Sequence, residues 1–156
     1  MIDVKVNGAE ELARLARDLK AAGDKDLRKE LFRSIQRSAG PAKEAARRSA
    51  SENLPNENGL ADEVAASRFS VRTRTGRDPS VRITGTGRAN EKGKEHDLNA
   101  LDRGRIRHPL YGNRGHWYTQ QVKPGWFSGA MEGQAPAVRE ELLKAIDEIK
   151  AKLGAK

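Results

Sequence analysis

The chain has 156 residues, a length typical of one domain built around a single modest core. Charged residues make up 33% of it and the net charge is +8, which indicates either an acidic partner, such as nucleic acid or an acidic protein surface, or a solvated basic face. The absence of cysteine excludes disulfides, thiolate metal sites and cysteine nucleophiles, and no apolar run approaches the roughly 18 residues that cross a bilayer.

The start of the chain predicts a strand followed by a helix. Residues 2–6 alternate apolar and polar side chains, as in a half-buried strand. Asn7 is expected to cap the helix with Glu10 as its reciprocal partner, and Gly23 is expected to end it. Residues 1–12 lack a basic stretch followed by an apolar run, so we expect no signal peptide.

A long second helix follows, interrupted by a proline. Asp24 is placed to cap it, and apolar side chains recur every four residues from Leu27 to Ala39. We expect either a kink at Gly40 and Pro41 or a break in which Pro41 opens a new helix, because proline lacks an N–H and clashes with the preceding turn. Beyond this point the buried face consists of alanines, which let another element approach closely.

Residues 68–88 predict a strongly basic β-hairpin. Alternating side chains in residues 69–73 and 81–83 indicate its two strands. Arginine suits bidentate contacts with phosphates or carboxylates better than lysine does. Flexible loops are expected near residues 53–59 and 84–95. The candidate basic contact face comprises Arg68, Arg72, Arg74, Arg77, Arg82 and Arg88.

The segment from Arg107 to Phe127 holds five of the seven aromatic residues. Aromatic side chains combined with glycine and proline indicate either a local core beneath a loop or a docking surface for a partner, and the sequence leaves both open. The last two rings of the segment could close the base of the following helix or contact a neighbouring molecule. The candidate interface residues are His108, Pro109, Tyr111, Trp117, Tyr118, Pro124, Gly125, Trp126 and Phe127.

The C-terminal residues predict an amphipathic helix. Ser128 is placed to cap it, and apolar side chains from Val138 to Leu153 recur at spacings of three and four. Taken with the preceding elements, this predicts an α+β fold in a single domain over residues 1–156. We expect an antiparallel sheet with a long kinked N-terminal helix region and the C-terminal helix packed on it.

Catalytic and metal-binding interpretations have little support in the sequence. His96, His108 and His116 are the strongest nitrogen ligands, and no helix or single strand fixes the geometry of the last two. Thr119 lies near His116, but nothing specifies the turn or the oxyanion donors that nucleophilic catalysis needs. We therefore expect no enzymatic activity, no metal and no cofactor.

The order of the predicted elements, together with two motifs, resembles the head–tail junction proteins of long-tailed bacteriophages, the neck or tail-completion family whose members are also called minor tail components. Members often carry a glycine and basic residues before His-Pro, then a short glycine-containing link. Members from phages of actinobacteria often carry a tryptophan followed by Pro-Gly-Trp-Phe. The first motif matches Gly104, Arg105, Arg107, His108, Pro109 and Gly112, and the second matches Trp117, Pro124, Gly125, Trp126 and Phe127.

This resemblance implies a structural, non-catalytic protein of the virion tail or neck, assembled in the cytoplasm of a bacterial host. It implies an α+β protomer in a homo-oligomeric ring, a hexamer or alternatively a dodecamer, that caps or completes the tail and joins it to the capsid. The ring would contact neighbouring connector and tail proteins, with the viral DNA as a further candidate partner, and no membrane. In this setting the basic face would meet acidic surfaces of adjoining rings or the exiting DNA.

The alternative from another class is a non-specific nucleic-acid-binding protein. It rests on the net charge and the arginine-rich hairpin, with Tyr111 or Trp117 stacking on bases. It predicts binding that weakens steeply with salt. No recognition helix, zinc finger or other nucleic-acid-binding module is visible in the sequence.

Overall fold

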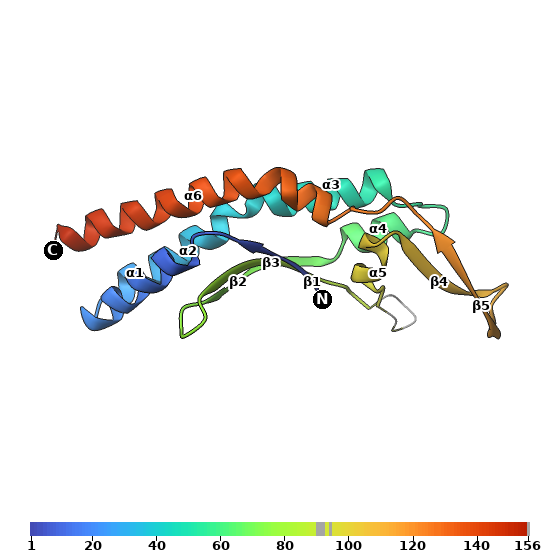
Figure 1. The fold of residues 1–156 in the computed structure, drawn as a ribbon, viewed down its shortest axis with the longest axis horizontal. Helices are drawn as coiled ribbons and strands as arrows, with labels where there is room; N and C mark the ends of the chain where they lie inside the picture. Colours follow the sequence, from blue (N-terminus) through green and yellow to red (C-terminus); the bar gives the residue numbers. More distant parts are fainter. Residues whose placement is uncertain (90–92, 94, 156) are drawn as a thin grey trace.

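The structure is a computed structural model that describes residues 1–89, 93 and 95–155. It confirms the α+β fold, with antiparallel strands, a bent helical region over residues 25–53 and a C-terminal helix. Figure 1 shows an elongated molecule in which helices cover one side of a three-stranded sheet. A separate two-stranded hairpin extends from one end, opposite the C-terminal end of the chain.

The main sheet has the antiparallel order β1–β3–β2, built from β1 (Ile2–Val6), β2 (Arg68–Arg74) and β3 (Ser80–Thr86). Alternation places apolar side chains of all three strands on the helix side, where Val4, Ile83 and Val71 lie opposite one another. Polar side chains occupy the outer side. The predicted hairpin is therefore confirmed, and β1 completes its sheet along β3.

The helices on the inner side are α1 (Ala9–Ala21), α2 (Lys25–Ser38), α3 (Gly40–Asn53) and α6 (Ser128–Gly154). The chain breaks between α2 and α3 with proline in the first turn of α3, as predicted. The buried face of α3, a helix that contacts both α4 and α6, consists of small side chains that let neighbouring backbones approach closely. These residues are Ala42, Ala46 and Ala50.

The start of α2 matches its prediction and the start of α1 does not. Asp24 accepts a hydrogen bond from the Leu27 amide at 3.0 Å, as expected for the cap of α2. Helix α1 instead begins after Gly8, which has φ +110° and leaves Asn7 no capping hydrogen bond. Only glycine adopts this left-handed conformation without strain.

The structure also has two short helices that the sequence did not predict, α4 (Leu60–Ala65) and α5 (Leu98–Asp102). Residues 84–86 of the predicted loop belong to β3, and Asn53 belongs to α3, so both loops are shorter than expected at those ends. Residues 90–92 and 94 of the predicted 84–95 loop lie outside the described residues.

The hairpin at the end of the molecule, hereafter the arm, consists of β4 (Arg105–Leu110) and β5 (Asn113–Gln121). Its two-residue turn is Tyr111 and Gly112, with φ +48° and +77°, the signs that a tight type I′ hairpin turn requires. The pairing shifts between Pro109 and Leu110, which marks a bulge near the tip. The sequence did not predict these strands.

Candidate interaction surfaces

Trp126 and Phe127 lie in the core. Their exposed fractions are 0% and 1%, and both rings pack on Phe69, at centroid distances of 6.4 and 6.2 Å. The Trp126 indole N–H donates to the Leu98 carbonyl at 3.4 Å. A buried ring cannot contact a neighbouring molecule, so the interface prediction is wrong for these two side chains. The local-core alternative describes them.

Asp102, and not Ser128, caps the start of helix α6. Helix α6 includes Ser128, whose amide donates to Asp102 Oδ1 at 3.0 Å, and the Phe127 amide donates to the same oxygen at 2.8 Å. A carboxylate from α5 thus satisfies two amides at the start of α6, where the helix dipole also favours negative charge. The backbone of Asp102 accepts a further hydrogen bond from Gly125 at 2.8 Å.

We expect Asp102→Ala to reduce the free energy of unfolding by about 1–2 kcal/mol, because two helix amides lose their acceptor. Asp102→Asn retains an oxygen acceptor and should cost less. Urea unfolding followed by circular dichroism measures both. Equal stability of the alanine variant and the wild type would show that water replaces the carboxylate without cost.

The remaining aromatics of the segment lie on the arm and are exposed. Tyr111, Trp117 and Tyr118 have exposed fractions of 98%, 49% and 53%. The Arg107 guanidinium lies 5.2 Å from the Trp117 ring centroid, and His108 packs edge-on against Tyr118 at 5.6 Å. These contacts order rings on both faces of the arm without covering them, so the docking interpretation remains open here.

The arm is basic and largely exposed to solvent. Residues 105–121 contain three arginines and no acidic residue, a net charge of +3. All nine residues of β5 are exposed. A two-stranded hairpin exposed on both faces is only marginally stable in water, so a partner would stabilise it. At the base, Pro124 is exposed and Gly125 half-buried, and neither lies on a strand.

The predicted basic face corresponds to the outer side of the main sheet. Lys5, Arg82 and Arg72 are directly opposite one another across β1, β3 and β2, and all three are exposed. Arg68 and Arg74 lie on the same side of β2, whereas the exposed Arg77 lies in the hairpin turn and the exposed Arg88 follows β3. The sheet therefore presents a cationic surface, the basic sheet face, defined by Lys5, Arg68, Arg72, Arg74 and Arg82.

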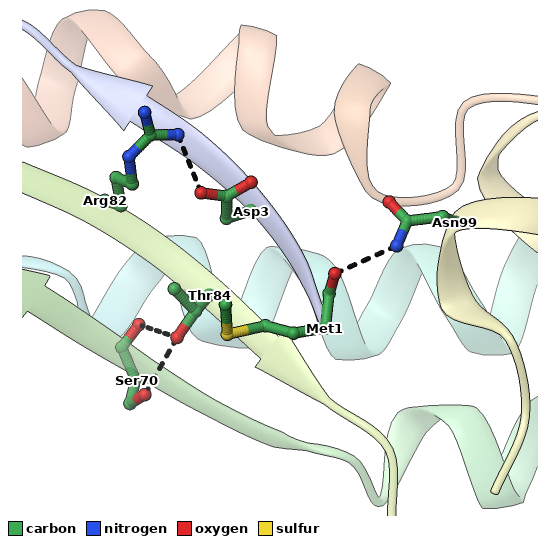
Figure 2. Close-up of polar contacts among 6 residues, drawn as sticks. All are labelled: Met1, Asp3, Ser70, Arg82, Thr84 and Asn99. Atoms are coloured by element: carbon green, nitrogen blue, oxygen red, sulfur yellow. Dashed lines mark hydrogen bonds and ion pairs between the residues drawn. The ribbon is translucent and has the colours of Figure 1, made fainter.

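Few acidic side chains neutralise the positive charges of the basic sheet face. Asp3 pairs with Arg82 at 2.7 Å, and Ser70 and Thr84 hydrogen-bond to each other at 3.0 Å (Figure 2). Five cations and one carboxylate give this face a net charge of +4. The Cβ atoms of directly opposite residues on neighbouring strands lie about 5 Å apart, so the like charges destabilise the sheet unless an anion binds.

A groove of about 1270 Å³ lies between the edge strand β1 and α6. Val4, Ala135, Pro136 and Leu143 supply apolar lining, and charged side chains surround them. We call this surface the β1–α6 groove. Its other lining residues are Lys5, Val6, Asn7, Ser128, Glu132, Arg139, Glu140, Lys144, Asp147 and Glu148. The sequence could not reveal it, because its two sides are more than 120 residues apart and each reads as part of an ordinary amphipathic element.

The histidines do not form a common site. The His96 ring hydrogen-bonds to the Glu63 carboxylate, His108 packs on Tyr118, and His116 is exposed on β5. Within residues 1–89, 93 and 95–155, no group of three or more histidine or acidic side chains is arranged to hold a metal ion. Over the same residues, no helix combines the length and apolar character needed to cross a membrane.

Comparisons with protein-family models, curated proteins and solved structures found no match to this chain. The observations that bear on function are therefore the motifs of the sequence and the three surfaces described above: the arm, the basic sheet face and the β1–α6 groove.

Proposed function

We propose that the protein is a structural component of a bacteriophage head–tail junction, a neck, tail-terminator or tail-completion protein that forms part of a ring joining the tail to the capsid. The observation that carries this proposal is the exposed arm. It contains Trp117 and all residues of the first motif except Gly104, which directly precedes β4; through these residues the sequence resembles that family.

The arm supports an assembly role in physical terms. Four of the five large hydrophobic side chains exposed among the described residues belong to it: Leu110, Tyr111, Trp117 and Tyr118. Aromatic and arginine side chains are the types most enriched in protein–protein interfaces. An isolated two-stranded hairpin gains its stability on docking, which suits a protein that orders fully only within a larger particle.

The proposal predicts a closed ring in solution. Light scattering after size exclusion should give a mass that is a whole multiple of the 17.2 kDa chain, and 6 × 17.2 kDa is 103 kDa for a hexamer. Negative-stain images of the same fractions should show rings with an open centre. A twofold dimer, or a monomer at every protein and salt concentration tested, would contradict it.

A genetic experiment tests the role within the virus. In a phage that encodes this chain, disruption of its gene should leave DNA-filled heads and separate tails. Complementation by the wild-type chain restores joined particles, whereas a chain lacking residues 105–121 should not. Infectious particles formed without the protein would contradict a junction role.

A second function, non-specific nucleic-acid binding, is favoured by the basic sheet face. Its cations follow three adjacent strands on a side that the helices leave uncovered (Figure 1). Each phosphate contact with duplex DNA contributes about −0.9 to the slope of log affinity against log salt. If the face contacts DNA, removing two of its arginines has a defined effect on that slope.

We expect Arg72→Ala with Arg74→Ala to reduce the magnitude of the salt slope by about 1.8. Fluorescence anisotropy with a short labelled duplex at several salt concentrations measures it. Arg105→Ala with Arg114→Ala is the matched control, since it removes the same charge from the arm. Equal effects of the two pairs would show that only net charge matters and would contradict a role for the face.

A further inference from the structure

Strand β5 has an unprotected edge. One edge pairs with β4, and no other strand of the described residues pairs with the opposite edge. Long exposed edges pair with other chains unless lysines, prolines or a covering element prevent it. β5 contains neither lysine nor proline, and Arg114 is its one permanent charge. Its edge is therefore available to another strand.

The main sheet has two edges that differ in accessibility. At the β2 edge, Gln36 donates to the Val71 carbonyl at 2.9 Å, and three of the seven residues of β2 are arginines. At the β1 edge, the strand borders the β1–α6 groove instead. Its volume of about 1270 Å³ exceeds the ~300–1000 Å³ typical of small-ligand pockets and suits a strand with large side chains.

The charges of the groove complement those of the arm. Four acidic residues and three basic residues line it, a net charge of −1 on a chain whose total is +8. The arm carries +3 and its arginines stand beside exposed rings. The acidic residues are Glu132, Glu140, Asp147 and Glu148, and the basic residues are Lys5, Arg139 and Lys144.

We propose that the arm of one copy docks in the β1–α6 groove of the next, with β5 adding to the sheet beside β1. Trp117 and Tyr118 point to opposite faces of β5, so one ring would contact the apolar lining of the groove and the other would lie over the outer side of the sheet. Each ring has about half of its surface left to bury, and the paired backbones and charged rims supply most of the ~800 Å² per partner of a standard interface.

The geometry makes this contact head-to-tail. Arm and groove are different surfaces, so each copy offers its arm to one neighbour and its groove to the other. Repetition of such a contact gives a ring where the rotation between copies closes, as the proposed function requires, and an open filament where it does not. Figure 1 shows the arm extending from the end of the molecule, away from β1 and the middle of α6. The inference deepens the proposed function by naming the two surfaces that join the protomers.

Site-specific cross-linking tests the contact. Because the chain has no cysteine, a thiol-reactive cross-linker reacts only at the introduced positions. Thr119→Cys on the arm is mixed with Lys5→Cys on β1 in a chain of different length, and a short thiol-reactive cross-linker is added. The matched control replaces Lys5→Cys by Arg72→Cys. Lys5 and Arg72 are both exposed and lie in the same cross-strand row, and each substitution removes one positive charge. They differ in that Arg72 lies on β2, the other edge strand of the sheet.

We expect at least five-fold more mixed dimer from the Lys5→Cys pair than from the Arg72→Cys pair. Adding Trp117→Ala and Tyr118→Ala to the arm should bring the yield down to that of the control. Equal yields from the two edges, or no mixed dimer at millimolar protein, would overturn the inference. If the wild type forms closed rings without Lys5→Cys cross-linking, the arm–groove contact fails and the ring proposal stands; if neither is seen, both fail.

Discussion

Trp126→Ala should reduce the free energy of unfolding by about 3–5 kcal/mol, the loss expected when a large core ring is replaced by a methyl group. The Trp126 ring is fully buried, touches the rings of Phe69 and Phe127, and donates its N–H to a backbone carbonyl. Truncation leaves a cavity where α5, β2 and the start of α6 meet. Equilibrium urea unfolding measures the change.

The other tryptophan is a matched control. Trp117 is half exposed on the arm, where its ring contacts the Arg107 guanidinium. Trp117→Ala should therefore change the unfolding free energy by about 0.5 kcal/mol or less, as is usual for surface substitutions. Similar losses for both variants would show that the core assigned to Trp126 is wrong.

Gly104→Ala should reduce stability by about 2–4 kcal/mol, combining left-handed backbone strain with a steric clash. Gly104 has φ +83°, and an added Cβ would lie 2.7 Å from the Val122 carbonyl oxygen. The same pair of residues is joined by a hydrogen bond from the Val122 amide to the Gly104 carbonyl at 2.9 Å. The clash therefore separates the two strands at the base of the arm.

Gly112→Ala separates strain from clash. Gly112 has φ +77°, but an added Cβ would meet no atom within 4 Å. It should cost only about 1 kcal/mol, because the strain is present and the clash is not. Hydrogen exchange of the arm amides should accelerate much more in Gly104→Ala. Equal exchange in the two variants would contradict a role of Gly104 in anchoring the arm.

The elements predicted correctly from the sequence are those with one buried face. Apolar side chains recur at helical spacing from Leu27 to Ile35 and alternate from Phe69 to Thr73, because one face of each element packs against the core. This periodicity identified the helix and the strand. The arm lacks this signal because β5 is exposed on both sides. Pro109 within β4 and the turn at Tyr111 further argued against a hairpin.

The candidate site was predictable in part for a related reason. Aromatic content alone cannot distinguish a core ring from a docking ring, since both consist of the same side chains. Trp126 and Phe127 become buried because α5 and β2 cover them, and those contacts join residues about 30 to 60 positions apart. The basic sheet face needed only strand alternation, so its arginines on β2 and β3 were placed correctly.

The length of α6 has a consequence for how the molecule diffuses. Its 27 residues extend about 40 Å, close to the full diameter of a compact domain of this size, and the arm lengthens the opposite end. Frictional drag therefore exceeds that of a sphere of equal mass. A single chain should sediment slowly and leave a gel-filtration column early, at the position of a heavier globular protein.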